Sequence, residues 1–232
     1  QVRLWYVLDA IATAEKNDLD PATIVAILTP DAYGDILDAN VNNAAIRTDD
    51  IAGSLGAKYG ITREECDFFA YRSQMRTKAA WEKGYFDDEV IPVIIPKTKK
   101  TPEIIFRADE FARPTTTLEG LAALKTVKPT GVVTAGNASG RNDGGAMVLM
   151  MTEEKAEELG YEPFARFVAG GNAGLDPKIM GLGPVDASLQ ALKVAGLKIE
   201  DIDLWECNEA FAAQNLGVIK SLQEKTGYTI NQ

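Results

Sequence analysis

The chain has 232 residues, of which 34 are acidic and 24 basic, a formal net charge of −10, two cysteines and no histidine. Without histidine it can form neither a Ser-His-Asp triad nor a Cys-His pair nor an imidazole metal site, and its acidic balance argues against general nucleic-acid binding. With 46% apolar and 25% charged residues the composition is that of a globular protein, and the longest apolar stretch, residues 146–151, is far below the roughly 20 residues that span a bilayer.

The first 50 residues differ from the rest of the chain. An apolar stripe with helical spacing covers residues 4–15, a short helical or strand-like run covers residues 22–28, and residues 31–50 have the composition of loops. We therefore leave residues 1–50 unassigned.

From residue 62 onward, start and stop signals predict alternating helices and strands. Thr62 and Glu65 form a capping box that begins a long helix, and Gly84 ends it. Further helices are predicted over residues 116–124, 152–159, 184–195 and 209–224. Strands are predicted over residues 90–95, where Pro92 favours a sheet edge, and over 131–134, 146–151, 164–168 and 202–206. This alternation favours a layered α/β fold.

Residues 134–145 (TAGNASGRNDGG) form a polar, glycine-rich loop between two apolar runs. Glycines let backbone N–H groups approach a ligand closely, and the Thr, Asn and Ser side chains add hydrogen-bonding groups. A turn that merely connects two strands explains the composition equally well. The loop is not a phosphate-binding P-loop, because no Gly-Lys-Ser/Thr follows it.

Asn208 stands where a predicted strand runs into a predicted helix. The simpler interpretation is that it caps the helix, and the alternative is that it meets a ligand at the carboxyl end of a strand. The glycine- and proline-rich residues 172–184 either orient the next helix or form a rigid pocket wall, to which Met180 would add an adaptable apolar surface.

The two cysteines and one basic stretch complete the candidates. Cys66 lies on the apolar face of the long helix and is interpreted as a core residue. Cys207 precedes a helix start, which can stabilise a thiolate, but packing at the end of a strand is the favoured interpretation. Two cysteines are too few for a disulfide scaffold and fit a reducing compartment. The basic residues at 97–113 are either solvated or a landing site for a phosphorylated small molecule.

Five of these stretches, taken in order, resemble the thiolase family, the acyl-CoA acyltransferases that make or cleave β-ketoacyl thioesters. The stretches are KYGITREECDFFAYRSQ (58–74), DDEVIPV (87–93), TAGNASGRNDGG (134–145), DPKIMGLGPV (176–185) and DIDLWECNEAFAAQ (201–214). The resemblance covers about residues 52–232. It implies an incomplete thiolase-like layered αβαβα fold, with a coenzyme-A-binding loop domain over residues 51–135 and core strands plus the first half of the carboxyl-terminal domain over residues 136–232.

The resemblance also implies roles for individual residues. Ser139 would contact the pantetheine arm of coenzyme A, and Arg113, which follows an Asp-Glu pair, would meet its nucleotide end. Asn208 would hold a water that hydrogen-bonds the thioester oxygen, where Claisen chemistry builds negative charge. The residues implied as pocket walls are Met180, Ala210 and Phe211. Coenzyme A and acyl-CoA are the expected ligands, as substrates, with no metal and no separate cofactor, in a cytoplasmic homo-oligomer with no membrane partner.

The chain departs from the family in its catalytic set. A thiolase uses a nucleophilic Cys to carry the acyl group, a Gly-His-Pro histidine and a second Cys that moves the α-proton. Neither Cys66 nor Cys207 lies in a motif that matches either catalytic cysteine, and the histidine is absent. We therefore expect an acetyl-CoA acetyltransferase-like chain that does not catalyse thiolysis by itself.

Two alternatives from other classes stay open. The first is a non-catalytic coenzyme-A-binding or assembly subunit that a partner chain completes. The second is a metal-dependent decarboxylating dehydrogenase-like protein, because residues 29–37 faintly resemble a metal-binding segment of that family. Its aspartates would correspond to Asp35 and Asp38, whose spacing of three differs from the four of that family.

Overall fold

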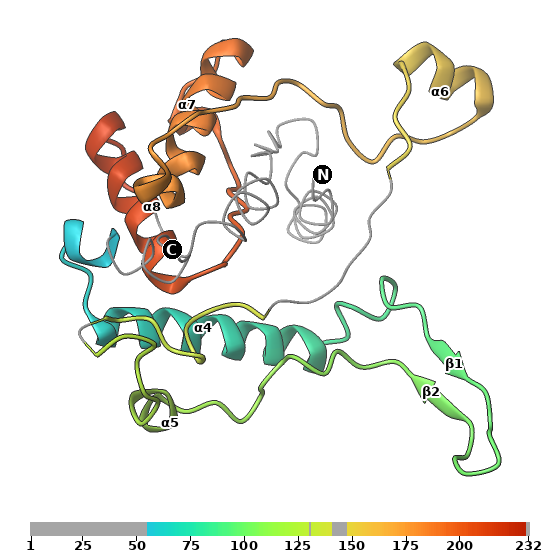
Figure 1. Cartoon of the computed structure of the whole chain (residues 1–232). Coiled ribbons are helices and arrows are strands. Elements are labelled where there is room, and N and C mark those ends of the chain that lie inside the picture. The colour runs from blue at the N-terminus through green and yellow to red at the C-terminus, as the bar shows by residue number, and fades with distance from the viewer. Residues whose placement is uncertain (1–54, 130, 141–147, 231–232) are drawn as a thin grey trace.

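The computed structural model describes residues 55–129, 131–140 and 148–230, which form mainly helices (Figure 1). The elements in chain order are α4 (Arg63–Glu82), β1 (Val93–Ile95), β2 (Ile104–Phe106), α5 (Leu118–Ala122), α6 (Glu153–Leu159), the 3-10 helix η2 (Pro177–Leu182), α7 (Gly183–Ala195), the 3-10 helix η3 (Ile199–Asp201) and α8 (Ala212–Thr226). In this part of the chain no helix is long and apolar enough to cross a membrane.

Helix α4 begins and ends as its sequence predicts. The Thr62 Oγ1 accepts a hydrogen bond from the Glu65 backbone N–H at 3.1 Å, and a Glu65 carboxylate oxygen accepts one from the Thr62 N–H at 2.7 Å. Gly84 follows the helix with a φ of +71°, a conformation that glycine adopts without the steric cost of a Cβ. The predicted apolar face is buried only in its first half, because beyond Ala70 the side chains along this face are half-buried.

The core is built around α8, which contacts α4 on one side and η2 and α7 on the other (Figure 1). Towards α4, its Ala212, Ala213 and Leu216 join Cys66 and Phe69 in one buried cluster. A second cluster lies towards η2 and α7 and consists of Leu55, Leu182, Val185, Val218 and Leu222. Helix α5 contacts α4 as well, so the helices pack in the order α5, α4, α8, α7. Elements from the first and the last parts of the described chain are therefore neighbours in the core.

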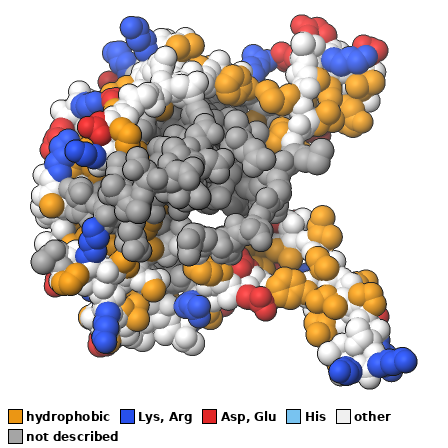
Figure 2. Space-filling model, in the orientation of Figure 1, with side chains coloured by type: hydrophobic (Ala, Val, Ile, Leu, Met, Phe, Trp, Pro, Cys, Tyr) orange, Lys and Arg blue, Asp and Glu red, His pale blue; other side chains and the backbone are white. Residues whose placement is uncertain are grey.

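Strands β1 and β2 form an antiparallel ribbon that projects away from the helices (Figures 1 and 2). Ile94 pairs with Ile105 at its centre, and all six strand residues are exposed. The residues at the turn include the exposed Lys97, Lys99 and Lys100. The predicted strand over residues 90–95 is therefore confirmed for its last three residues. Because the ribbon has only two strands, this strand lies at a sheet edge, as Pro92 indicated.

Three predicted strands are wrong. Residues 164–168 and 202–206 form no strand, and residues 131–134 reach only an isolated bridge between Thr134 and Thr126, so across 55–129, 131–140 and 148–230 the β1–β2 ribbon is the only sheet. The run at 146–151 is described only from residue 148, where it is not a strand either. A strand needs a hydrogen-bonded neighbour, and β-branched or aromatic residues alone do not supply one. Phe164, for example, is 73% exposed.

The other helix predictions hold with shifts at their starts. Helices α6 and α7 end at Gly160 and Gly196, both with left-handed φ values, as predicted. The cap of α5 is Thr117 rather than Thr116, since its side chain accepts from the Gly120 N–H at 3.0 Å. Helix α8 begins at Ala212 rather than at residue 209.

Candidate functional site

A pocket of about 250 Å³ lies beside α4, where four segments distant in sequence meet. They are the half-buried face of α4, residues 109–112, the loop at 136–139 and the residues around the start of α8. The lining residues are Phe69, Ala70, Ser73, Gln74, Thr77, Asp109, Phe111, Ala112, Gly136, Asn137, Ala138, Ser139, Glu209 and Ala212. The Ser73 hydroxyl donates a 2.5 Å hydrogen bond to the Glu209 carboxylate, which joins α4 to the segment before α8.

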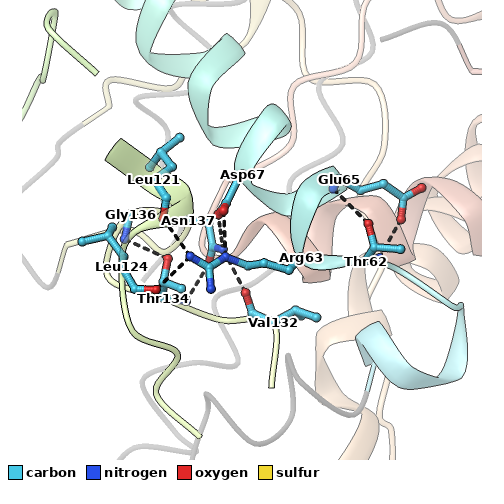
Figure 3. Close-up of polar contacts among 10 residues, drawn as sticks. All are labelled: Thr62, Arg63, Glu65, Asp67, Leu121, Leu124, Val132, Thr134, Gly136 and Asn137. Atoms are coloured by element: carbon cyan, nitrogen blue, oxygen red, sulfur yellow. Dashed lines mark hydrogen bonds and ion pairs between the residues drawn. The ribbon is translucent and has the colours of Figure 1, made fainter. Parts of the chain in front are cut away.

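Asn137 holds the glycine-rich loop in place from its middle (Figure 3). It is 5% exposed, and its amide nitrogen donates to the Asp67 carboxylate at 3.0 Å and to the Val132 carbonyl at 2.9 Å. Its amide oxygen accepts from the Thr134 N–H at 2.8 Å, and its main-chain carbonyl accepts from the Ala212 N–H at 3.0 Å. One residue thus connects α4, the preceding turn and the first residue of α8.

The Asp67 carboxylate is buried, 4% exposed, and both of its oxygens have partners. One accepts from Asn137, and the other accepts from the Arg63 Nε at 2.7 Å, one helical turn earlier on α4. The Arg63 Nη2 also donates to the carbonyls of Leu121 and Leu124, at 2.7 and 3.0 Å (Figure 3). This arginine therefore pairs with a buried carboxylate and also donates to two carbonyls at and just beyond the end of α5.

The loop and the segment before α8 lie side by side. The Ser139 N–H donates to the Ala210 carbonyl at 2.8 Å, and Ala138 and Phe211 form an isolated antiparallel bridge. Of the residues predicted for the site, Ser139, Ala210 and Phe211 are therefore brought together, and Ser139 lines the pocket.

Asn208 does not cap α8, so the cap interpretation is wrong. The residue at the N-cap is Phe211, which makes no side-chain capping bond. Residues 210–212 bind the glycine-rich loop instead, and this pairing keeps Phe211 extended, with a φ of −144°, so the helix begins later. The exposed Asn208 offers its main-chain carbonyl to the N–H of Ala210 and to the side-chain amide of Asn215, both at 3.0 Å.

Arg113 and Met180 lie outside the pocket lining. Arg113 follows Ala112 of the pocket wall, is exposed, and is held by its backbone N–H, which donates to the Gln74 side chain at 2.8 Å. Met180 is half-buried in η2 and precedes Gly181, whose carbonyl accepts from Gln214 of α8 at 3.2 Å. The structure thus places Arg113 at the edge of the pocket and Met180 on the other side of α8.

Neither cysteine has the properties of a nucleophile. Burial raises the pKa of the Cys66 thiol to about 12, and the neighbouring Asp67 and Glu65 carboxylates add to the effect. Burial likewise raises the pKa of Cys207 to about 12, with a further contribution from Glu206 and Glu209. Both cysteines are free thiols. The helix that could have stabilised a Cys207 thiolate starts five residues later, at Ala212.

Sequence reasoning missed the roles of Arg63, Asp67 and Asn137. One signal was available, since Asp67 directly follows the buried Cys66 on the predicted helix and lies four residues after an arginine, the spacing of an ion pair on one face. Nothing local indicated Asn137 as the partner, 70 residues away. Across the described ranges no group of three or more His, Cys, Asp or Glu residues could hold a metal ion, and Asp35 and Asp38 lie outside those ranges.

The comparisons with known proteins define the class. A model of the thiolase N-terminal domain matches residues 18–154, and a model of the thiolase C-terminal domain matches residues 161–231. The chain therefore belongs to the thiolase family. The match reaches further towards the N-terminus than the resemblance drawn from the motifs.

Individual relatives agree with this class. An acetyl-CoA acetyltransferase of Allochromatium vinosum is 53% identical over 168 residues, which cover 72% of this chain and 42% of the relative. The mitochondrial 3-ketoacyl-CoA thiolase of Rattus norvegicus is 51% identical over 172 residues, covering 74% and 43%. The chain thus spans less than half the length of these relatives.

Solved structures show the same fold. The acetyl-CoA acetyltransferase of Bacillus anthracis superposes with a TM-score of 0.72 at 47% identity, covering 77% of this chain and 45% of that one. The human mitochondrial 3-ketoacyl-CoA thiolase in complex with CoA gives a TM-score of 0.64 at 44% identity, covering 75% and 42%. The fold of this chain is an incomplete thiolase-like α/β fold.

Proposed function

We propose that this chain is the coenzyme-A-binding part of a thiolase-type acyltransferase, whose complete activity is that of an acetyl-CoA C-acetyltransferase. The observation that carries the proposal is the hydrogen bond from the Ser139 N–H to the Ala210 carbonyl, at 2.8 Å beside the pocket. It joins two of the motifs on which the family resemblance rests. The names of the relatives, and the neighbouring structure in complex with CoA, support this ligand.

The predicted site residues other than Met180, which lies on the other side of α8, have roles in this proposal. The exposed Ser139 hydroxyl at the pocket hydrogen-bonds the pantetheine arm, and the exposed Arg113 guanidinium at its edge pairs with phosphate groups of the nucleotide. Asn208 binds the water that donates to the thioester oxygen, a contribution of a few kcal/mol as negative charge develops there. The apolar parts of Ala210 and Phe211 contact the ligand beside the pocket.

We propose that these 232 residues bind the thioester without turning it over. Claisen condensation and thiolysis need a thiolate to carry the acyl group and a base to move the α-proton. The chain has no histidine, and the raised pKa values keep both of its thiols protonated near neutral pH. Metal and redox cofactors have no part in this proposal, in which the coenzyme A thioester is the substrate.

The same observations favour a second candidate, a non-catalytic coenzyme-A-binding or assembly subunit that a partner completes. The first candidate places the chain in a homo-oligomer, in line with the family. The two free thiols support a reducing compartment, which we propose is the cytoplasm.

Calorimetric titration of the purified chain with coenzyme A tests the proposal. We expect binding that weakens about fivefold in Ser139→Ala, since a single hydrogen bond contributes about 1 kcal/mol. Arg113→Ala should weaken it by a similar factor at low salt and by less at high salt, because an exposed ion pair is screened. Lys193→Ala removes an equal charge from the exposed side of α7 and should change nothing.

Thiolysis of acetoacetyl-CoA by free coenzyme A, measured on the same samples, separates the outcomes. Binding without turnover supports the proposal for the chain by itself. Turnover would contradict the protonated state of the thiols, and the absence of any binding would contradict the assignment of the pocket.

A further inference from the structure

We infer that Asn137 is a positioning residue for the coenzyme A pocket, acting through the buried chain Arg63–Asp67–Asn137. This inference rests on the proposed function and assigns a task to three side chains that the ligand itself need not touch.

The Asn137 side-chain amide uses both of its N–H groups and its oxygen in hydrogen bonds at a buried position. Both N–H groups are donated, to the Asp67 carboxylate and the Val132 carbonyl, and the oxygen accepts from the Thr134 N–H. With 5% of the residue exposed, these groups have little contact with bulk water in the folded chain. An aliphatic residue here would leave a carboxylate oxygen, a carbonyl and an N–H unpaired together.

These contacts join elements that are matched by two different domain models of the thiolase family. Arg63 and Asp67 lie on α4 and reach the end of α5, all within the region matched by the thiolase N-terminal domain. The Asn137 main-chain carbonyl accepts from the Ala212 N–H, at the start of α8, within the region matched by the C-terminal domain. Asn137 is therefore a direct connection between the two regions at the pocket wall.

Ser139 lies two residues beyond Asn137 in the loop. A Cβ at Gly136 would lie 2.5 Å from methyl groups of Leu121 and Leu124, so the loop lies close against the end of α5 on one side of Asn137. On the other side, the Ser139 N–H donates to the Ala210 carbonyl, next to the bridge between Ala138 and Phe211. Without Asn137 the loop can leave α8, and the apparent affinity falls with the fraction of molecules that keep the binding geometry.

Four variants and one control test this. Asn137→Ala removes the side-chain contacts. Asp67→Asn preserves shape but removes the charge, and serves if the alanine variant does not fold. Asn137→Asp sets two carboxylates against each other, and the double variant Asp67→Asn/Asn137→Asp exchanges donor and acceptor and restores that hydrogen bond. Leu192→Ala opens a cavity in the separate cluster with Ile199 and Ile202, and is the control for lost stability.

For each variant, coenzyme A affinity is measured by calorimetry well below the unfolding temperature, together with that temperature and hydrogen exchange of the Ser139 and Ala212 amides. We expect Asn137→Ala and Asn137→Asp to weaken binding about tenfold or more and to accelerate exchange of both amides. The double variant should recover part of the affinity lost by Asn137→Asp. Leu192→Ala should lower the unfolding temperature yet leave affinity and these two amides unchanged.

Equal affinity in Asn137→Ala and Leu192→Ala, when both are folded, would overturn the inference, as would a double variant no better than Asn137→Asp. If the unmodified chain does not bind coenzyme A at all, the proposed function fails. The exchange rates then still decide the positioning role, because protection of Ser139 and Ala212 that survives Asn137→Ala contradicts it and lost protection supports it.

Discussion

Treating the folded chain with an aromatic disulfide at about pH 8 measures whether Cys207 can act as a nucleophile. Burial raises the pKa of its thiol to about 12, whereas an exposed thiol has a pKa of about 8.5. At this pH about a quarter of an exposed thiol is ionised, compared with roughly one part in 10,000 of Cys207. The more basic thiolate is intrinsically more reactive by a factor of about 40, so we expect a reaction roughly 60-fold slower than that of free cysteine.

The assay uses Cys66→Ala, which leaves Cys207 as the single thiol of the chain. The rate should rise about tenfold for each pH unit without a plateau below about pH 10, because the thiolate fraction still increases there. In denaturant the same thiol should react at the rate of free cysteine. A plateau near neutral pH, or a rate equal to that of free cysteine in the folded chain, would refute the reasoning and make Cys207 a candidate nucleophile.

Three predictions concern the stability of the folded chain. The pKa of Cys66 is higher in the folded chain than in the unfolded chain, so the protonated thiol stabilises the fold fully below about pH 8.5. This stabilisation declines by about 1.4 kcal/mol per pH unit between about pH 8.5 and about pH 12. Urea unfolding at alkaline pH should therefore show a steeper loss of stability for the unmodified chain than for Cys66→Ala. Leu216→Ala should lower the free energy of unfolding by about 2–5 kcal/mol, since it leaves a cavity between α8 and α4; a loss below about 1 kcal/mol would contradict this packing. Thr62→Ala should cost about 1 kcal/mol by removing the capping box of α4, whereas Thr98→Ala, at the exposed turn of the ribbon, should cost much less.

The helix boundaries that the sequence predicted correctly depend on a few adjacent residues. The capping box of Thr62 and Glu65 and the glycines at 84, 160 and 196 act within one turn of the chain, so their effect does not depend on the rest of the molecule. The ordered motifs likewise identified the thiolase family, which the family models confirm.

Most of the failed predictions concern contacts between distant segments. The segments at 164–168 and 202–206 have strand-like composition, but a strand exists only when a second one lies beside it, and the segment at 131–134 reaches only an isolated bridge to Thr126. Asn208 is of a residue type that often caps helices. The hydrogen bond between Ser139 and Ala210 keeps the chain extended here, so α8 begins at Ala212, too far along the chain for Asn208 to cap it. The roles of Arg113, Ser139, Met180 and Asn208 towards a ligand stay predictions.

By itself the sequence determined the family, the start of α4, the ends of α4, α6 and α7, and the lack of a histidine for catalysis, because each is a property of local sequence or of composition. Only the tertiary structure decided that Asp67 and Asn137 meet, that the glycine-rich loop is joined to the start of α8, and that burial raises the pKa of both thiols. The physical reason is that hydrogen bonding between distant residues, and the burial that raises a pKa, arise only when separate segments pack together.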